Sequence, residues 1–248
     1  CLGVRGMLHK LAAQDQRPGL CIVGEPTEFQ PVVAHKGKWS FLARVRGKEC
    51  HSSLAPTGVN AVEYAAEAVT WLRREGRRFA AEGERDELYD PPHTTVHVGT
   101  LHGGTALNIV PQEASFVFEY RHIMQDNPDD IHQRFLKFIR EELEPEMQAI
   151  DPSTGFSIES ISQIPGLEIS PEHEVVNLAR QLSGRNDHAK VAYGTEAGLF
   201  QEIASIPTVV CGPGNIEQAH KPNEFLTLDQ LAKGEEFMQR LGDRVCAV

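Results

Sequence analysis

The sequence has no apolar run that approaches the roughly twenty residues needed to cross a bilayer, and its first residues do not follow the charged-then-apolar pattern of a secretory leader. Basic residues are also few: 24 Lys and Arg stand against 35 Asp and Glu, which gives a formal net charge of -11. Nucleic acid and anionic membranes both require an excess of positive charge on the protein. We therefore expect a protein that acts on small molecules and binds neither nucleic acid nor membrane.

Cysteine is scarce and shows no pairing pattern. The five cysteines are an odd number without a close pair, and two of them fall inside apolar, strand-like runs. They are Cys1, Cys21, Cys50, Cys211 and Cys246. This pattern does not predict a disulfide framework and indicates the reducing cytoplasm. A Gly-x-Ser-x-Gly turn is absent, and the cysteines lack a plausible neighbouring base, so a serine or cysteine hydrolase is disfavoured.

The length and composition allow one large domain or two modest ones. The chain has 248 residues, of which 40% are hydrophobic, enough for each of two domains to have its own core. It opens Cys-Leu-Gly without an initiator methionine. We interpret it as a truncated protein.

The middle of the chain predicts a separate lobe. Period-two alternation of apolar residues indicates four strands, and three-and-four spacing indicates two helices. The strands are expected at 39–46, 94–98, 116–121 and 156–161, and the helices at 62–78 and 128–143. The resulting order, β-α-β-β-α-β, is that of the ferredoxin-like split βαβ unit, an antiparallel sheet with two helices on one face. We expect this lobe to span residues 38–160.

The two flanking segments, 1–37 and 161–248, alternate between helical and extended patterns, as in an α/β domain. Helices are expected at 7–13, 175–183, 199–204 and 228–245, and strands at 20–23, 191–193 and 207–211. The sequence thus predicts one α/β domain in two pieces, interrupted by the lobe.

Two residues, one in each flanking segment, are candidate metal ligands. Glu25 follows the apolar run Leu20–Val23 and precedes a proline, and His220 ends a glycine-rich loop and precedes Lys-Pro. A carboxylate and an imidazole with little conformational freedom suit zinc. Each signal is weak by itself, because Glu25 could be a solvated turn residue and His220 an ordinary loop histidine. Together they suggest ligands that meet at the mouth of one sheet.

With these motifs the chain resembles the aminoacylase and acetylornithine deacetylase group of dinuclear zinc amidohydrolases, which includes succinyl-diaminopimelate desuccinylase. The resemblance covers essentially the whole chain. The Gly24-Glu25-Pro26-Thr27 turn matches the family's zinc-binding turn, and His220 with Lys221 matches its last zinc ligand. The resemblance implies two zinc ions in a complete site, with cobalt as a possible substitute, and a homodimer formed through the inserted lobe.

Three lobe residues match family site residues. His51 lies in Gly47-x-x-x-His51-x-x-x-x-Pro56, and the resemblance implies that it enters an active site, often the partner's, and donates a hydrogen bond to the oxyanion of the tetrahedral intermediate. Asn108 matches an Asn that contacts substrate, and Arg121 a carboxylate-binding arginine. Plain alternatives stay open: a helix-entry histidine, an Asn that supports the hairpin, and a solvated arginine.

The segment Gly194-Thr195-Glu196 follows an expected strand and opens an expected helix, so it could bind an anion or simply cap the helix. In the family this loop lines the substrate pocket, and Gly-Thr-Glu-Ala is the form associated with acetylornithine deacetylases. Glu196 would then attract the side-chain amine of ornithine. The resemblance therefore implies hydrolysis of N-acetyl-L-ornithine to acetate and ornithine, a step of arginine biosynthesis.

The chain departs from the family before Gly24. Family members carry there a His-x-Asp motif and a Glu-Glu pair that supply further zinc ligands and the general base, and neither is present. We expect the 248-residue chain by itself to be inactive. Alternatives are a desuccinylase or aminoacylase of the same family, and a non-catalytic dimerisation or ligand-binding module in which the helix of residues 60–78 and its edge strand pair the subunits.

Overall fold

The computed structural model describes residues 2–14, 17–219 and 221–246. Their contacts divide the chain into two compact units. The terminal unit comprises Cys1–Gly37, Glu87–Asp90 and Ile164–Val248, and the central unit comprises Lys38–Asp86 and Pro91–Gln163. Within the described ranges, no helix combines the length and the apolar character that a membrane crossing requires.

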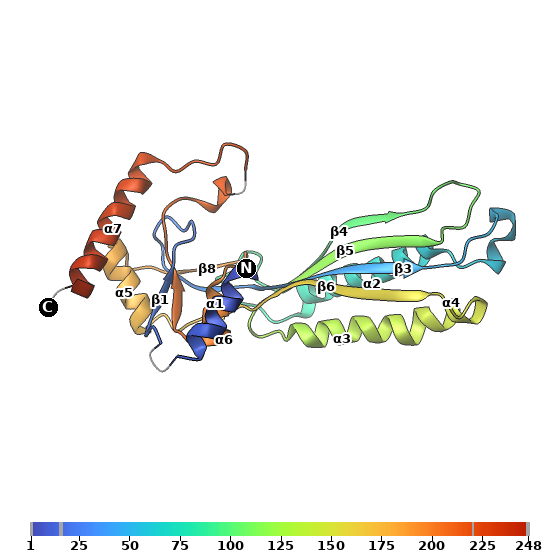
Figure 1. Cartoon of the computed structure of the whole chain (residues 1–248), viewed down its shortest axis with the longest axis horizontal. Helices are drawn as coiled ribbons and strands as arrows, with labels where there is room; N and C mark the ends of the chain where they lie inside the picture. The colour runs from blue at the N-terminus through green and yellow to red at the C-terminus, as the bar shows by residue number, and fades with distance from the viewer. Residues whose placement is uncertain (1, 15–16, 220, 247–248) are drawn as a thin grey trace. The chain divides into compact units, whose positions relative to one another are not determined.

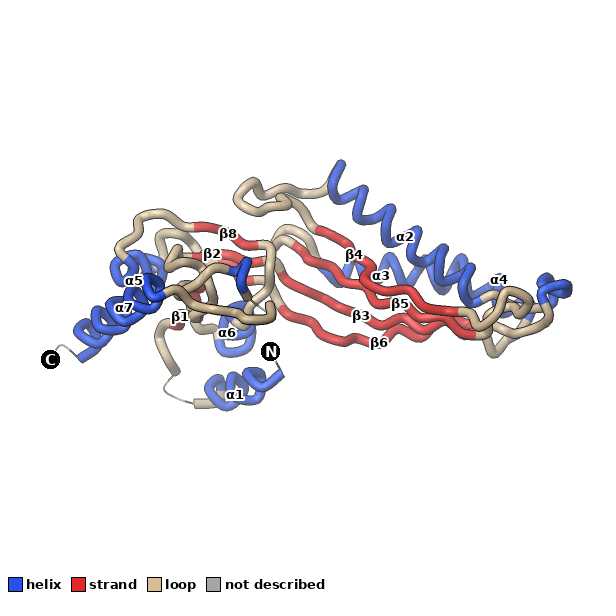
Figure 2. The backbone as a smooth tube through the Cα atoms, turned by 90° about the horizontal axis from the view of Figure 1, so that it is seen from above, coloured by secondary structure: helices blue, strands red, loops and turns tan. Residues whose placement is uncertain are grey.

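The central unit is a four-stranded sheet with helices along one face (Figure 2). Its strands are β3 (Gly37–Arg46), β4 (Thr95–Gly103), β5 (Glu113–His122) and β6 (Gly155–Ile164). They lie side by side in the order β4-β5-β3-β6, and β4 pairs with β5 in antiparallel register from Thr95↔Arg121 to Gly103↔Ala114. This is the strand order of the predicted ferredoxin-like βαββαβ unit, and the predicted fold class is confirmed.

The helices that cover this sheet are α2 (Ala61–Glu82), α3 (Pro128–Phe138) and α4 (Glu144–Ile150), with a π-helical turn η2 (Ile139–Leu143) between the last two. The side chain of Asn60 caps α2 and that of Asn127 caps α3, each accepting hydrogen bonds from free backbone N–H groups. Pro128 occupies the first turn of α3, where its missing N–H costs nothing. The expected helix at 128–143 therefore begins as predicted and extends further, through the π turn to Ile150.

Alternation along β5 explains the core of the central unit. Residues Ala114, Phe116, Phe118 and Tyr120 are buried, whereas the residues between them are partly exposed. The ring of Phe118 lies 5.2 Å from that of Phe41 on β3 and 5.1 Å from that of Phe135 on α3, measured between centroids. Each buried aromatic side chain contributes about 1.5–3 kcal/mol relative to exposure. Sheet and helices are therefore held together chiefly by apolar burial.

The terminal unit contains a five-stranded mixed sheet (Figure 1). Its strands are β1 (Cys21–Val23), β2 (Val32–His35), β7 (Leu167–Glu168), β8 (Ala189–Val191) and β9 (Thr208–Val210). The order is β1-β9-β2-β7, with β8 also paired to β2; β1 and β9 are parallel, whereas β2 runs antiparallel to β9. The sequence analysis missed β2 and β7.

Helices pack on both sides of this sheet. Alternate residues such as Ile22, Val33 and Val209 share a core with helices α5 (Glu174–Ser183) and α7 (Leu228–Cys246). The intervening residues pack toward α6 (Ala197–Ala204), which in turn contacts α1 (Leu2–Ala12). This arrangement agrees with the predicted α/β class.

The connection between α2 and β4 contributes residues to the terminal unit. Helix α2 continues to Glu82, and the four residues Glu87–Asp90 belong to the terminal unit. Tyr89 is buried there, with the ammonium groups of Lys36 and Lys190 at 5.7 and 5.5 Å from its ring centroid. These are cation–π distances.

Candidate active site

Glu25 lies in the terminal unit, directly after β1, and is partly buried. The turn that carries it is bonded to the loop after β9, because Thr27 forms an isolated bridge with Asn215. The Thr27 N–H donates to the Gly212 carbonyl at 3.2 Å, and the Gly212 N–H donates to Thr27 Oγ1 at 3.1 Å. Two segments nearly 190 residues apart in the chain are thus joined beside Glu25.

Gly212 is required by this close approach. A Cβ atom at that position would lie 2.6–2.7 Å from backbone atoms of Gly24 and Glu25, which is closer than any real Cβ contact. The glycine therefore allows the loop after β9 to lie directly on the Glu25 turn.

Two consecutive residues after the turn, Glu28 and Phe29, have left-handed backbones with φ of 50° and 59°. Each costs of order 1 kcal/mol or more for a side chain other than glycine. The corner is held by hydrogen bonds from the Glu28 N–H to the Gly214 carbonyl (2.8 Å) and from the Phe29 N–H to the Gly212 carbonyl (2.9 Å). Phe29 also packs on Phe237 of α7, with ring centroids 5.3 Å apart.

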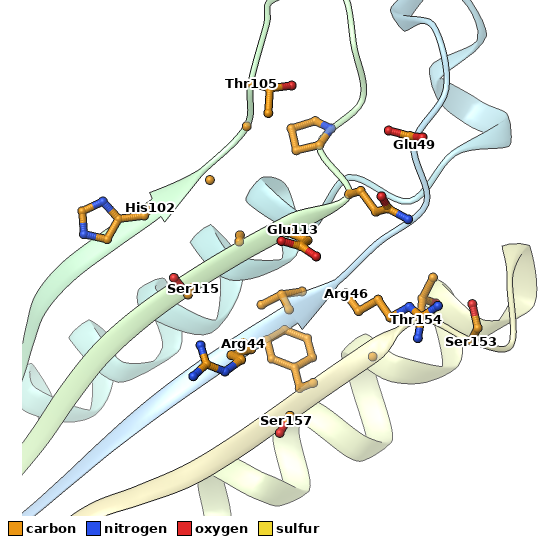
Figure 3. Close-up of a pocket in the computed structure, with 18 of the residues that line it drawn as sticks. Arg44, Arg46, Glu49, His102, Thr105, Glu113, Ser115, Ser153, Thr154 and Ser157 are labelled. Carbon is orange, nitrogen blue, oxygen red and sulfur yellow. The ribbon is translucent and has the colours of Figure 1, made fainter.

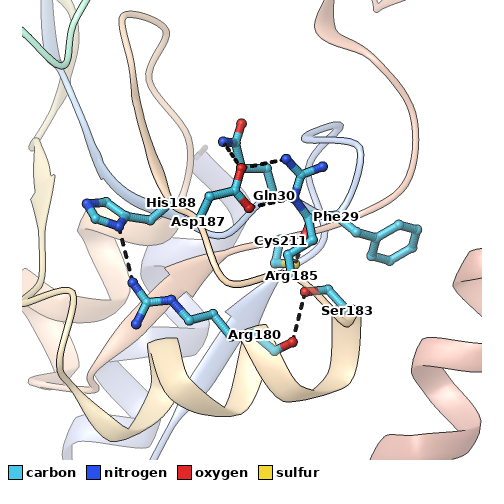
Figure 4. A network of polar contacts seen from close by, with 8 residues as sticks. All are labelled: Phe29, Gln30, Arg180, Ser183, Arg185, Asp187, His188 and Cys211. Carbon is cyan, nitrogen blue, oxygen red and sulfur yellow. Dashed lines mark hydrogen bonds and ion pairs between the residues drawn. The ribbon is translucent and has the colours of Figure 1, made fainter.

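A polar network secures the next residue (Figure 4). Gln30 Nε2 donates to Asp187 Oδ2 at 2.8 Å, and Arg185 forms two further hydrogen bonds with the same carboxylate. Arg185 lowers the pKa of Asp187 to about 2. The buried Cys211 thiol donates to the Phe29 carbonyl, and burial raises its pKa to about 12, so it is protonated at neutral pH. Cys211 is a structural thiol.

His220, the second expected metal ligand, lies outside the described residues. Of the loop that leads to it, the structure describes Asn215, which caps the short helix η3 (Ile216–Gln218). Across residues 2–14, 17–219 and 221–246, no group of three or more His, Cys, Asp or Glu side chains is arranged to hold a metal ion. The described residues therefore do not complete a metal site. Of the two expected ligands, Glu25 belongs to the part of the chain that the structure describes.

The Gly194–Glu196 segment lies in the same unit, between β8 and α6. Burial, and next the negative charge of Glu25, raise the pKa of the adjacent Tyr193, so this loop is within electrostatic range of Glu25. Thr195 is buried, and its Oγ1 accepts a hydrogen bond from the Ala197 N–H at 3.0 Å. The hydroxyl thus caps α6, whereas the partly buried Glu196 makes no capping hydrogen bond with its side chain.

His51 and Asn108 lie together in the central unit. The backbones of their loops pair, because His51 forms a bridge with Ile109, the Ser52 N–H donates to the Asn108 carbonyl at 3.0 Å, and the Val110 N–H donates to the Cys50 carbonyl at 2.9 Å. Both side chains are exposed.

The ring of His51 is held in one orientation. Its Nδ1 accepts the Ser53 N–H at 3.2 Å and lies 2.8 Å from Ser53 Oγ, so His51 caps the short helix η1 (Ser52–Thr57). An Nδ1 atom that accepts a hydrogen bond carries no proton, and the neutral ring then has its hydrogen on Nε2. His51 therefore presents an N–H donor on its far side.

Arg121 lies at the opposite end of the sheet from these loops. Asn108 precedes the first residue of β5, Glu113, whereas Arg121 is eight residue steps further along the strand, about 26 Å at ~3.3 Å per residue. Its Nε donates to Glu119 Oε1 at 2.7 Å, and Lys38 also pairs with Glu119 at 3.4 Å. Burial opposes the charge of Glu119, but Arg121 and Lys38 outweigh burial and lower its pKa. Within one copy of the central unit, Arg121 therefore lies far from His51 and Asn108.

A cavity of about 1030 Å³ lies in the central unit, beside the His51 and Asn108 loops (Figure 3). Arg44 and Arg46 of β3, His102 of β4 and Glu113 of β5 line it, but none of the site residues expected from the sequence does. Arg44 is paired with Glu159 at 3.5 Å. This cavity is therefore not the expected substrate site.

Sequence reasoning did not identify Thr27, Tyr193 or Gly212 as residues that lie near Glu25 or hold its turn in place. The glycines in Cys211-Gly-Pro-Gly214 were a usable signal, since glycine permits close backbone approach. The partners in that approach are distant in sequence, and no local pattern indicates them.

Comparison with known proteins shows what the chain is similar to. Residues 33–147 match the peptidase dimerisation domain. The chain is 32% identical over 241 residues to the acetylornithine deacetylase of Photorhabdus laumondii and 33% identical over 245 residues to that of Myxococcus xanthus. These alignments cover 97% and 99% of this chain, but 60% and 62% of the relatives. The chain therefore spans about three fifths of their length.

Solved structures show the same fold. A tripeptidase from Staphylococcus aureus superposes with a TM-score of 0.67 at 22% identity, covering 90% of this chain and 56% of that one. An M20 family metallo-carboxypeptidase from Sulfolobus solfataricus gives a TM-score of 0.66 at 16% identity, with 95% and 65% covered. The match of residues 33–147 to the peptidase dimerisation domain and the similarity over nearly the whole chain confirm the predicted resemblance: the chain is similar to acetylornithine deacetylases.

Proposed function

We propose that this chain is the larger part of a metal-dependent deacetylase that removes the acetyl group from N-acetyl-L-ornithine. This proposal rests on sequence similarity: the chain is 32–33% identical, over 97–99% of its length, to enzymes named acetylornithine deacetylase. It spans 60–62% of those enzymes, so both the reaction and the substrate are proposals for this protein.

His51 supplies the oxyanion donor in this proposal. Its Nδ1 is occupied by Ser53, and its exposed Nε2–H is oriented away from the loop. A donor fixed before substrate arrives stabilises a developing negative charge without reorganisation, and the loss of one such donor lowers kcat by about 10²–10³-fold. Asn108, on the paired loop, would contact the substrate beside it.

A complete site in this proposal needs two copies of the chain. Arg121 and the His51–Asn108 pair lie at opposite ends of β5, about 26 Å apart at ~3.3 Å per residue, which is too far for one small substrate. Arg121 of one copy and His51 of its partner can meet at one substrate only in a dimer. The match of residues 33–147 to a dimerisation domain supports this arrangement.

Zinc or cobalt, when bound, would polarise the scissile carbonyl and make a water molecule more acidic. Glu25 and His220 are the proposed ligands from this chain, and Thr27, Gly212 and the 28–29 corner fix the position of Glu25. The general base and the remaining ligands are not among the described residues, so we expect no turnover from the 248 residues alone.

Glu196 is the proposed determinant of the ornithine side chain. It is partly buried, makes no capping hydrogen bond with its side chain, and stands in a loop within electrostatic range of Glu25. A carboxylate there favours a cationic substrate side chain, while Gly194 and Thr195 shape the backbone of the pocket.

The decisive experiment assays the polypeptide as its gene encodes it, including any residues that precede Cys1. With zinc or cobalt, release of ornithine from N-acetyl-L-ornithine is expected to exceed that from N-succinyl-diaminopimelate and from neutral N-acyl amino acids. Glu196→Gln should raise KM for acetylornithine and leave neutral substrates unaffected. A preference for the succinylated or neutral substrates would reassign the chain to a desuccinylase or an aminoacylase.

A non-catalytic role is the second candidate, because the match to the dimerisation domain concerns residues 33–147 alone and the described residues hold no metal cluster. In that case the encoded polypeptide would dimerise but bind no metal. Metal analysis of the purified dimer separates the two candidates.

A further inference from the structure

The cavity of about 1030 Å³ lies on the face of the central sheet that is turned away from its helices (Figure 3). Arg44 and Arg46 on β3 and Glu113 and Ser115 on β5 are exposed or partly exposed, whereas the residue between each two is buried. Successive residues of a strand face opposite sides of a sheet. These four side chains therefore share the face opposite to the helices, and a cavity of this volume is large enough for a small organic ligand.

Charged side chains of both signs line this cavity together with one histidine: Arg44, Arg46, Glu49, Glu113, Glu144 and His102. Two of them are already engaged within the chain. Arg44 pairs with Glu159 at 3.5 Å, and Glu144 Oε1 accepts the Phe156 N–H at 2.9 Å. With histidine counted as neutral, one guanidinium and two carboxylates remain to meet a ligand.

The remaining groups are Arg46, Glu49 and Glu113, which we call the unpaired triad. Among residues 2–14, 17–219 and 221–246, none of the three makes an ion pair or a side-chain hydrogen bond. Hydrogen bonds from Ser153 chiefly lower the pKa of Asp151, and Arg46 contributes least to that change. The guanidinium of Arg46 is therefore not committed to Asp151.

Arg46 and Glu113 face one cavity from neighbouring strands. Strands β3 and β5 are adjacent, and next to these two residues the Gly47 N–H donates to the Gln112 carbonyl at 2.7 Å. Paired strands lie about 4.8 Å apart, yet in the described part of the chain the two opposite charges do not form an ion pair with each other. A ligand that carries a carboxylate and an ammonium on one carbon atom can bridge such a pair.

We propose that this cavity binds a basic α-amino acid, such as ornithine or lysine. Its carboxylate accepts hydrogen bonds from Arg46, its α-ammonium donates to Glu113, and its side-chain cation donates to Glu49. The unpaired triad carries one positive and two negative charges, and a basic amino acid carries the reverse. The inference stands apart from the proposed deacetylase activity, since it uses only charges that line the cavity.

Other small ligands match the unpaired triad less well. Phosphate or a dicarboxylate would meet two carboxylates beside one available guanidinium. A diamine would leave Arg46 without a partner, and a neutral amino acid would leave Glu49 without one. Charge complementarity of this kind selects among ligands more than it adds affinity. Because all three side chains are exposed, each contact is partly screened, and we expect binding that weakens with salt.

The test titrates the ¹⁵N-labelled 248-residue chain, at low salt and with a chelator present, with L-ornithine and three analogues that each lack one charged group. Putrescine lacks the carboxylate, 5-aminovalerate lacks the α-ammonium, and L-norvaline lacks the side-chain ammonium. L-Ornithine is expected to shift the backbone amide signals of residues 44–49 and 112–115. Each analogue should bind about three- to tenfold more weakly, as expected for the loss of one partly screened charge pair.

Variants of the unpaired triad assign each contact. Arg46→Gln should weaken L-ornithine by about three- to tenfold and putrescine by much less, because putrescine has no carboxylate to lose. Glu113→Gln should likewise affect L-ornithine more than 5-aminovalerate, and Glu49→Gln more than L-norvaline. Arg73→Gln is the matched control, since Arg73 is exposed on α2 and does not line the cavity, and it should bind L-ornithine as the parent chain does. Far-UV circular dichroism checks that each variant is folded.

Three results would overturn the inference: amide shifts that spare residues 44–49 and 112–115, analogues that bind as tightly as L-ornithine, or inorganic phosphate that binds more tightly than L-ornithine. Deacetylase activity of the encoded polypeptide without L-ornithine binding at these strands rejects this inference alone. L-Ornithine binding at these strands without deacetylase activity rejects the proposed function alone.

Discussion

At the scale of single residues, the orientation of His51 is the feature that bears most directly on chemistry. The ring accepts the Ser53 N–H through Nδ1, so the neutral form is expected to carry its proton on Nε2. Long-range proton–nitrogen spectra of the ¹⁵N-labelled chain at pH 8 should show that tautomer. Ser53→Ala removes the hydroxyl but keeps the N–H, and should leave the tautomer unchanged. A proton on Nδ1 in either protein would contradict the proposed donor role.

Backbone strain at Glu28 belongs to the same scale. Asparagine adopts left-handed φ angles more readily than glutamate, so Glu28→Asn is expected to raise the free energy of unfolding by about 0.5–1 kcal/mol. Urea unfolding followed by circular dichroism measures the change. Glu172→Asn is a matched control, since Glu172 is also exposed but does not have a positive φ. Equal effects at the two positions would show that the corner stores no strain.

At the scale of elements, the buried carboxylate of Glu75 joins two helices of the central unit. Its Oε2 lies 2.7 Å from Arg134 on α3 and 3.1 Å from Arg78 on α2, and its side chain is 11% exposed. Removing one partner leaves buried charge unpaired, though the arginines are partly solvated. Glu75→Gln is therefore expected to destabilise the unit by about 1–3 kcal/mol, whereas Glu141→Gln, in an exposed pair with Lys137, should change stability by less than about 0.5 kcal/mol. Fluorescence-monitored urea unfolding distinguishes these results.

His132 on α3 predicts that the stability of the central unit depends on pH. Burial lowers the pKa of His132, with Asp129 opposing and Arg140 reinforcing the change, and the ring stacks on Phe41 at 4.3 Å. Below the unfolded value of 6.5 the unfolded chain binds the extra proton and the folded chain does not. Stability of the central unit should therefore fall as pH drops from 7 toward 5, by at most about 1.4 kcal/mol per pH unit for each such histidine. His132→Phe keeps the stacking and should flatten this slope; His122, whose pKa burial also lowers, accounts for any remainder.

At the scale of the whole molecule, the two compact units predict unfolding in two steps. Both tryptophans, Trp39 and Trp71, are partly buried and pack against the core of the central unit, so their fluorescence follows that unit alone. Circular dichroism follows helices of both units. Non-coincident urea transitions from the two probes are expected. A single shared transition would instead show that the units fold cooperatively, and would count against the domain boundaries drawn at residues 37–38 and 160–161.

The sequence by itself determined the type and order of most elements, because a period of two or of 3.6 residues is a local property that survives without knowledge of partners. Strand β2 shows no such period. All four of its residues, including His35, are buried, so apolar and polar positions do not alternate along it. Tyr89 stands in a segment rich in charged residues and is nevertheless buried. Its partners Lys36 and Lys190 are distant in the chain, so no local pattern indicates this burial.

The candidate site likewise has parts that the sequence determined and parts that only the tertiary structure decided. Motifs at Glu25, His51, Asn108 and Gly194–Glu196 were recognisable in the sequence because a turn or a helix start has local chemistry. Only the tertiary structure decided that Gly212 and Thr27 meet beside Glu25, that His51 pairs with Ile109, and that Arg121 lies at the far end of β5. These relations depend on which segments pack against one another, and packing is set by burial and backbone hydrogen bonding across the whole fold, which local spacing does not encode.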